Sequence, residues 1–159
     1  MDSIKNQKCP FCLKNSATLS EDEKNIKEVG KVFILKLKCD ACGINTQEVE
    51  IEGNKKPKVE FKVKNQNDLK KQIIKSSSAI IKIPELKISI KPTENSVGDI
   101  TTVQEFIDNL IKYIQETNEI SSNEYKKSEK LLDELDAAKE NNGNITLIIE
   151  DKEGNSAIV

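Results

Sequence analysis

Four cysteines, arranged as two pairs, are the residues of this sequence whose type and spacing could do chemistry. The pairs are Cys9 with Cys12 and Cys39 with Cys42, and two residues separate the members of each pair. This spacing lets both sulfurs of a pair reach one metal ion, and four thiolates complete a tetrahedral Zn²⁺ site. Gly43, directly after the second pair, permits the positive φ that such a turn requires. The sequence therefore predicts a zinc ribbon holding one structural Zn²⁺.

Other uses of the four cysteines stay open on spacing alone. Two disulfides would suit a secreted protein, a redox-active pair would suit a thioredoxin-like βαβ unit, and iron also accepts four thiolates. The sequence shows neither a signal peptide nor a βαβ pattern, which favours zinc. Histidine is absent, so no imidazole can complete the metal's coordination or act as a general base. Because four thiolates leave no open coordination position, we expect the protein not to be an enzyme.

Length and composition limit the class of protein. A chain of 159 residues can hold a small metal module and one further domain. Its hydrophobic content of 36%, without tryptophan, predicts a core built from isoleucine, leucine and valine. No apolar stretch approaches the ~20 residues that a membrane span needs. Reduced cysteines and the lack of a targeting segment lead us to expect a cytoplasmic protein without a membrane partner.

Lysine supplies every one of the 25 basic residues, and the formal net charge is −2. Without arginine, bidentate recognition of phosphate or guanine is unavailable, which counts against sequence-specific DNA binding. A nucleic-acid-binding role remains the alternative function, because lysines gather on and after the predicted ribbon. Alternating strands that direct lysine to solvent explain this pattern more simply. The lysines in question are Lys36, Lys38, Lys55, Lys56, Lys58, Lys62 and Lys64.

The first two thirds of the chain carry strand patterns. The polar segment 15–27 is expected to be a mobile loop, and the apolar run 32–38 is expected to be a strand that delivers the second cysteine pair. Apolar residues then recur with a period of two, which is typical of half-buried strands. These further strands are predicted at 49–51, 59–63, 73–74, 79–83 and 86–90.

The hydrophobic period changes to that of a helix at residue 102. Thr102 and Glu105 match a capping box, and an apolar stripe that includes Phe106 and Leu110 follows. A second helix is predicted from a cap at 121–124 to a stop at 141–143, and a short polar link around Asn118 makes the pair a helical hairpin. The apolar run 145–149 predicts a central strand, and a turn and a short final strand follow it. The order of these elements predicts an all-β sandwich or barrel-like body with an inserted helical hairpin.

Taken together, these segments resemble the zinc-finger proteins of the ZPR family over nearly the whole chain. The resemblance rests on the two cysteine pairs and on four further segments in the same order. These segments are Ser76-Ser77-Ser78-Ala79 leading into Ile83-Pro84-Glu85-Leu86, the helix start Thr101-Thr102-Val103, the run Thr146-Leu147-Ile148-Ile149-Glu150-Asp151, and Gly154-Asn155-Ser156. A single copy in a chain of this length resembles the archaeal, single-module form.

The resemblance implies a mainly β fold with an α insertion. It places a zinc ribbon at 1–50 and a double-stranded β-helix domain at 51–159, with the helical hairpin at 102–141. It also implies a chaperone-like partnership with the GTPase translation elongation factor one alpha. Phe11 and Leu13 are our candidates for the partner-binding surface, because ribbons present apolar knuckle residues outward and Phe11 lies between two ligands. Packing of Phe11 beneath the knuckle is the open alternative.

Overall fold

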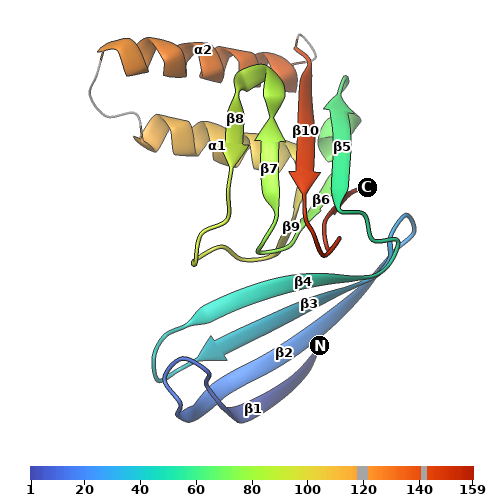
Figure 1. The fold of residues 1–159 in the computed structure, drawn as a ribbon, viewed down its shortest axis with the longest axis vertical. Helices are drawn as coiled ribbons and strands as arrows, with labels where there is room; N and C mark the ends of the chain where they lie inside the picture. The colour runs from blue at the N-terminus through green and yellow to red at the C-terminus, as the bar shows by residue number, and fades with distance from the viewer. Residues whose placement is uncertain (118–121, 141–142) are drawn as a thin grey trace.

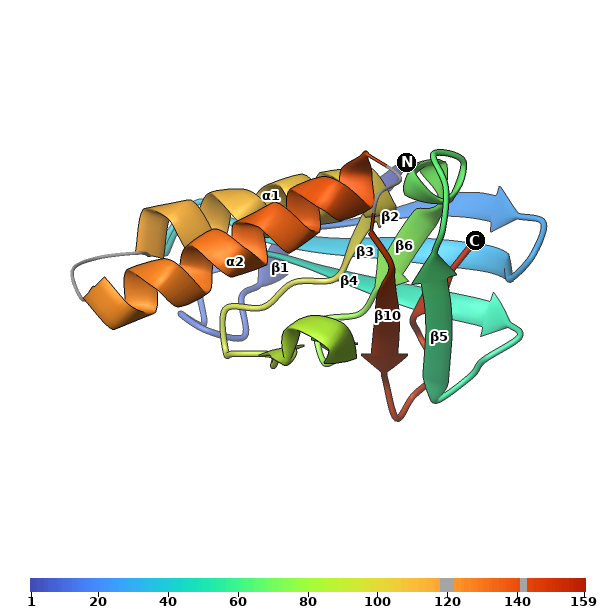
Figure 2. The same ribbon diagram turned by 90° about the horizontal axis from the view of Figure 1, so that it is seen from above.

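Two bodies of β-sheet and a pair of helices make up the computed structural model, which describes residues 1–117, 122–140 and 143–159. The lower body in Figure 1 is one sheet, and the upper body carries two further sheets and both helices. Figure 2, a view from above, shows the two helices side by side. The predicted link around Asn118, the start of the second helix's cap at Ser121 and the stop at Asn141 and Asn142 lie outside the described residues.

The lower body is an antiparallel sheet of four strands in the order β1-β2-β3-β4. The strands are β1 (Asp2–Lys8), β2 (Asn15–Ile26), β3 (Gly30–Cys39) and β4 (Asn45–Gly53). The expectation of a mobile loop at 15–27 is therefore wrong. Its polar residues form β2, because the segment pairs with β3 from Ala17 opposite Cys39 to Ile26 opposite Gly30. Backbone pairing with a neighbour on each side overrides the weak strand signal of a polar sequence.

The upper body contains two antiparallel sheets. One has the order β5-β10-β7-β8 and the other the order β11-β6-β9. The bounds are β5 (Lys58–Val63), β6 (Gln72–Lys75), β7 (Ile80–Ile83), β8 (Ile88–Ile90), β9 (Asp99–Thr102), β10 (Ile145–Glu150) and β11 (Ala157–Ile158), with short 3-10 turns η1 (Asp68–Lys70) and η2 (Pro84–Leu86). The apolar run 145–149 is a central strand, as predicted. The strand expected at 86–90 is shorter, because Leu86 belongs to the turn that Pro84 begins.

Two helices, α1 (Val103–Thr117) and α2 (Ser122–Lys139), follow β9 and cover the upper body. The predicted capping box is confirmed: the amide of Glu105 donates to Oγ1 of Thr102 at 3.1 Å, and the amide of Thr102 donates to Oε2 of Glu105 at 2.8 Å. The predicted stripe buries Ile107 and Leu110 in one core with Leu135 of α2 and with apolar residues of both sheets. Neither helix in the described part of the chain is long and apolar enough to cross a membrane.

A second apolar core joins the two bodies at the end of the lower sheet that lies away from the cysteines. Val32, Val49 and Ile51 of the lower sheet pack there with Ile74 and Ala157 of the upper body. A hydrogen bond reinforces this joint, because the amide of Ile51 donates to the buried side-chain oxygen of Asn155 at 3.1 Å. A further contact lies nearer the cysteines, where the amide of Gly98 donates to the carbonyl of Gln47 on β4 at 2.7 Å. The lower sheet is thus fixed on the upper body by the core at this end and by contacts along β4.

Candidate metal centre

All four cysteine sulfurs meet at the free end of the lower sheet. Cys9 and Cys12 lie in the turn between β1 and β2, Cys39 ends β3, and Cys42 lies in the turn before β4. The pairing of Ala17 with Cys39 brings the two turns together. The four Sγ atoms all lie within 4.8 Å of one another, so the structure assembles every cysteine that the sequence singled out.

The separations between the sulfurs fit a tetrahedral metal site. Sγ of Cys9 lies 3.8 Å from Sγ of Cys42, and Sγ of Cys12 lies 3.7 Å from Sγ of Cys39. A tetrahedron with Zn–S bonds of about 2.3 Å places its sulfurs about 3.8 Å apart. All four thiols are free, and these distances far exceed the ~2 Å of a disulfide bond. The geometry therefore excludes the two-disulfide alternative in this structure.

The two cysteine turns have the same backbone geometry. In the first, the amide of Leu13 donates to the carbonyl of Cys9 at 2.9 Å, and in the second the amide of Gly43 donates to the carbonyl of Cys39 at 2.9 Å. Leu13 and Gly43 thus hold equivalent positions, with φ of 64° and 75°. The positive φ predicted for Gly43 is confirmed. A leucine in this conformation is strained by roughly 1–2 kcal/mol, so Leu13 stands where glycine would be more stable.

Hydrogen bonds make the protonation of the metal-free thiols unequal. The hydroxyl of Ser16 lies 3.1 Å from Sγ of Cys39 and, with nearby backbone amides, lowers the pKa of Cys39 to about 6. The amide of Ile44 acts to lower the pKa of Cys42, but desolvation and the neighbouring thiols outweigh it and raise that pKa to about 11. Cys39 therefore offers a ready thiolate to an incoming cation, whereas Cys42 must release its proton to bind it.

Phe11 and Leu13 both project from the first cysteine turn into solvent. Phe11 is 64% exposed and Leu13 is 65% exposed. The alternative in which Phe11 packs beneath the knuckle is therefore wrong. The small core beside the sulfurs consists instead of Cys9, Ala17 and Cys39, with Cys12 and Ile44 packed against it.

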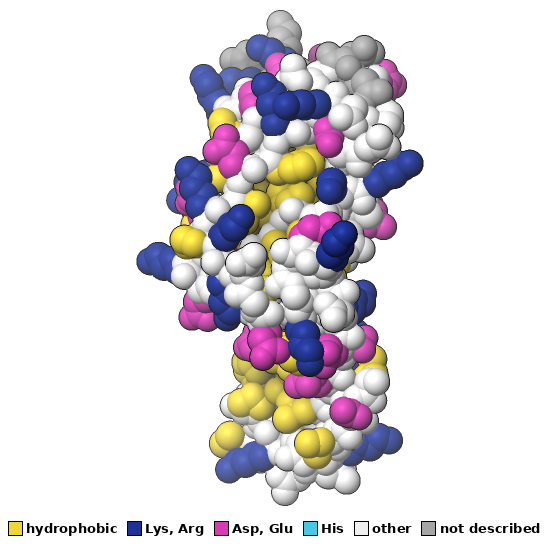
Figure 3. Space-filling view, turned by 90° about the vertical axis from the view of Figure 1, so that its right-hand side faces the viewer, with side chains coloured by type: hydrophobic (Ala, Val, Ile, Leu, Met, Phe, Trp, Pro, Cys, Tyr) yellow, Lys and Arg dark blue, Asp and Glu magenta, His cyan; other side chains and the backbone are white. Residues whose placement is uncertain are grey.

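An apolar row crosses the outer face of the lower sheet next to the cysteines. Ile4 lies opposite Leu19, and Leu19 lies opposite Leu37. Two residues further along β2 and β3, Ala17 lies opposite Cys39, so the row adjoins the metal site. Ile4 and Leu19 are 61% and 41% exposed. Figure 3 shows hydrophobic side chains gathered on this lower part of the surface, with acidic side chains beside them.

The lysines of the nucleic-acid alternative do not share one element. Lys36 and Lys38 lie on β3 of the lower sheet, while Lys58 and Lys62 lie on β5 of the upper body. The exposed Glu60 lies between the two lysines of β5. This distribution is typical of solvated strand faces, and it favours the simpler explanation over a nucleic-acid surface.

The upper body contains a buried polar cluster that was not predicted from the sequence. Oδ2 of Asp151 accepts hydrogen bonds from the hydroxyls of Ser76 at 2.8 Å and Ser156 at 2.7 Å. The amide of Ser77 donates to Oε1 of Glu48 on the lower sheet at 2.9 Å. The serine run and the two C-terminal segments that carried the family resemblance therefore meet in space, where their hydrogen bonds connect strands of the upper body to one another and to the lower sheet. Their spacing in the sequence gave no signal of this contact.

Comparison with known proteins agrees with this structure. The family model of the ZPR1 jelly-roll domain matches residues 67–159, and a jelly roll is a double-stranded β-helix. A ZPR1-like protein of Methanocaldococcus jannaschii is 30% identical over 100% of this chain and 82% of its own length. A ZPR1-like protein of Pyrococcus horikoshii is 25% identical over 95% of this chain and 71% of its own length.

Eukaryotic relatives are longer. The zinc finger chaperone zpr1 of Schizosaccharomyces pombe is 30% identical over 90% of this chain, which spans 33% of that protein. Zinc-finger relatives, together with four sulfurs in tetrahedral spacing, identify the metal as a structural Zn²⁺. This chain therefore belongs to the ZPR1 family of zinc-finger proteins, as its matched jelly-roll domain, its full-length archaeal relative and its four-cysteine zinc centre show.

Proposed function

We propose that this chain is a zinc-dependent protein-binding module that acts as a chaperone-like partner of a GTPase of the translation elongation factor one alpha type. It binds the incompletely folded or nucleotide-free factor and assists its folding. The zinc has a structural role and the chain turns over no small-molecule substrate, because four thiolates leave the metal no open position. The site of action is the cytoplasm, where the cysteines stay reduced.

The observation that carries this proposal is the exposure of Phe11 and Leu13 on a turn that the metal holds in place. Exposed apolar side chains on a fixed support are suited to anchor a protein partner. The left-handed φ of Leu13 adds to this, since strain kept at an exposed position points to a role other than stability. The neighbouring row from Ile4 to Leu19 extends the apolar surface. The name of the fission yeast relative, a zinc finger chaperone, supports the same class of function.

The test measures association of the purified chain with the purified factor by calorimetry, in nucleotide-free and nucleotide-bound states. Phe11→Ala and Leu13→Gly should each weaken the complex at least about tenfold, equivalent to roughly 1.4 kcal/mol, while zinc content stays unchanged. Leu13→Gly also relieves the backbone strain, so a weaker complex with this variant cannot be ascribed to instability. Tyr113→Ala, an equally exposed side chain on α1, is the matched control and should bind normally.

Two results would overturn the proposal. One is the absence of association at tens of micromolar in every nucleotide state, together with refolding of the factor that this chain does not improve. The other is tight binding of RNA that collapses with added salt, which would favour the nucleic-acid alternative. A complex that rests on apolar contacts should persist as the salt concentration rises.

A further inference from the structure

The helical pair extends past the edge of the sheet beneath it. Strand β8 is the last strand of the sheet β5-β10-β7-β8. In Figure 1, α1 and α2 continue beyond β8 on the side away from β7, and in Figure 2 both helices extend far to the side away from β10 and β5. The space beneath this overhang is where one more strand of the sheet would lie.

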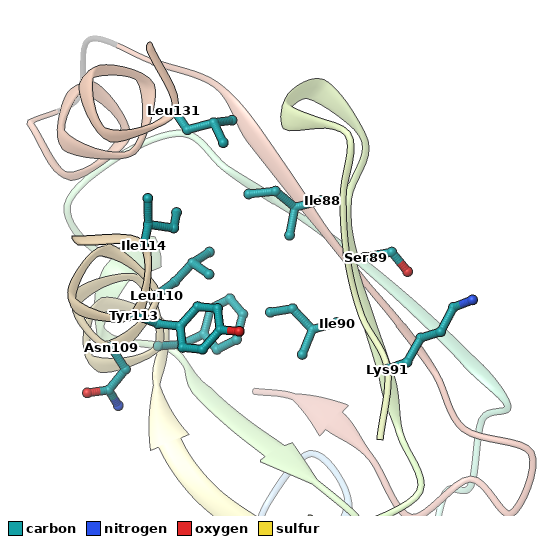
Figure 4. Close-up of a pocket in the computed structure, with 10 residues that line it drawn as sticks. Ile88, Ser89, Ile90, Lys91, Asn109, Leu110, Tyr113, Ile114 and Leu131 are labelled. Atoms are coloured by element: carbon teal, nitrogen blue, oxygen red, sulfur yellow. The ribbon is translucent and has the colours of Figure 1, made fainter. Parts of the chain in front are cut away.

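A cavity of about 540 Å³ occupies this space. Ile88 and Ile90 point into it from β8, Leu110 and Ile114 from α1, and Leu131 from α2, while the ring of Tyr113 lies at its side (Figure 4). Ile90 and Tyr113 are 37% and 63% exposed, so the apolar lining is only partly covered. Burial of apolar side chains from another chain would remove this surface from water.

The outer edge of β8 supplies hydrogen-bonding groups beside the cavity. Within the described part of the chain, β8 pairs with β7 and with no other strand. An edge strand leaves alternate backbone N–H and C=O groups unpaired, and these can pair with an added strand. The strand has three residues and Pro92 follows soon after, so an added segment can pair over a short length only.

The charges beside β8 favour some added strands over others. Lys87 precedes β8 and Lys91 follows it, and both are exposed. Among the described residues, neither lysine forms an ion pair. A strand with acidic residues at both ends would place opposite charges against these lysines, whereas a basic strand would be repelled.

We propose that β8 and the overhanging helices form a docking site for an extended segment of another protein, which has alternating aliphatic residues and an acidic residue at each end. The segment adds to β8 as a fifth strand. Its inward side chains enter the cavity between Ile90, Ile114 and Leu131, and its acidic ends lie near Lys87 and Lys91. The site is independent of the proposed function, because it uses no residue of the zinc knuckle.

The probe is an acetylated and amidated peptide in which valine alternates with threonine between two aspartates. Titration into the full, zinc-loaded chain, followed by amide NMR, should show saturable binding with shifts centred on Ile88–Ile90. The same peptide with lysines in place of the aspartates should bind at least about tenfold more weakly. A third peptide, with proline at its centre, should not bind, since proline removes a ladder hydrogen bond.

Variants of the chain locate the site. Lys87→Glu combined with Lys91→Glu should lower the affinity for the aspartate peptide at least about tenfold and reverse the preference between the two peptides. Ile90→Glu should abolish binding. Two control variants should leave peptide binding unchanged. Ile4→Glu makes the same change at a more exposed isoleucine of the lower sheet, and Phe11→Ala changes the knuckle. Equal melting temperatures of the variants confirm that each one is folded.

Three outcomes would overturn this proposal. The first is absence of saturable binding by the aspartate peptide, and the second is equal affinity for the lysine peptide. The third is that the wild-type chain forms a dimer without peptide and that Ile90→Glu dissociates it. That result would show that the edge of β8 binds a second copy of this chain. Loss of binding to the elongation factor in Phe11→Ala, with normal peptide binding, would separate this site from the proposed function.

Discussion

At the scale of single residues, each of the four ligands matters because the chain has no fifth cysteine and no histidine to replace it. Cys12 or Cys42 cannot be substituted by a nearby imidazole, since the sequence contains no histidine. The ligands also lie on two separate turns, so the loss of one leaves a three-coordinate site with an open position.

Replacement of Cys39 by serine should therefore release the metal. Elemental analysis of the purified, reduced wild type should find one Zn²⁺ per chain, and Cys39→Ser should hold far less. Ser16→Ala is the matched control: it removes the hydroxyl beside Sγ of Cys39 but no ligand, so it should retain zinc. Full zinc occupancy in Cys39→Ser would show that the metal is held elsewhere.

Zinc affinity should fall with falling pH. Because the pKa of Cys42 is about 11, this thiol is protonated at neutral pH and must lose its proton to the solvent when zinc binds. Each displaced proton lowers the affinity about tenfold per unit of pH decrease. The pKa of Cys39 is about 6, so Cys39 is a thiolate above that pH and adds one more displaced proton below it.

Competition with a chromophoric chelator across this pH range measures the slope. The dependence should become steeper below about pH 6, and Ser16→Ala should move this change to higher pH, because it removes the hydrogen bond that lowers the pKa of Cys39. An affinity independent of pH would mean that all four thiols are deprotonated before zinc arrives.

The metal ligands were predictable from the sequence, whereas the surface around them was not. Spacing within a pair fixes a local turn, so Cys9 and Cys12 could be assigned without knowledge of the fold. Whether Phe11 points outward depends on what lies beneath the knuckle, and that space is filled by Ala17 from a neighbouring strand. The left-handed φ of Leu13 had a signal in its place directly after the first cysteine pair, which Gly43 matches after the second, but leucine rarely adopts this conformation and so hides it.

At the scale of elements, an apolar stripe decides how α1 is placed. Leu110 is 8% exposed in the core, and Tyr113, three residues further along, is 63% exposed. The sequence predicted this helix well, because both its capping box and its period of apolar residues are local patterns. Strand β2 could not be predicted in the same way, since its polar residues are held by pairing with β1 and β3.

Leu110→Asp should destabilise the whole chain. A carboxylate at this position would be buried among apolar side chains without a partner, at a cost of several kcal/mol, comparable with the stability of a small domain. Tyr113→Asp introduces the same charge on the exposed side of the same helix and should change the free energy of unfolding by less than about 0.5 kcal/mol. Chemical denaturation followed by circular dichroism compares the two. Equal stabilities would mean that α1 does not depend on this contact.

At the scale of the whole molecule, the lower sheet is held by different forces at its two ends. The metal holds one end, where the small core contains cysteines, an alanine and an isoleucine. The other end shares a core with the upper body, and the amide of Ile51 is bonded to Asn155. This second attachment joins residues 104 positions apart, so no local pattern in the sequence could predict it.

Removal of zinc should therefore loosen one end of the lower sheet and leave the rest folded. With a chelator present, amides around Cys9 and Cys39 should exchange rapidly with solvent, because too little apolar surface remains to hold the two turns. Amides around Val49 and Ile51 should stay protected by the shared core, as should those of β10 in the upper body. Hydrogen exchange followed by mass spectrometry or NMR resolves the three regions.

The variant Asn155→Ala tests the other attachment. It leaves the buried amide of Ile51 without its acceptor, at a cost of about 1–3 kcal/mol, but it does not touch the metal. With zinc bound, amides at both ends of the sheet should stay protected from exchange in this variant. The metal still holds one end, and the weakened shared core still holds the other. With zinc removed, the amides around Ile51 should lose protection as well. If amides of the upper body also lost protection when zinc was removed from the wild type, the two bodies would unfold as one unit. The prediction that the two ends of the lower sheet are held independently would then be wrong.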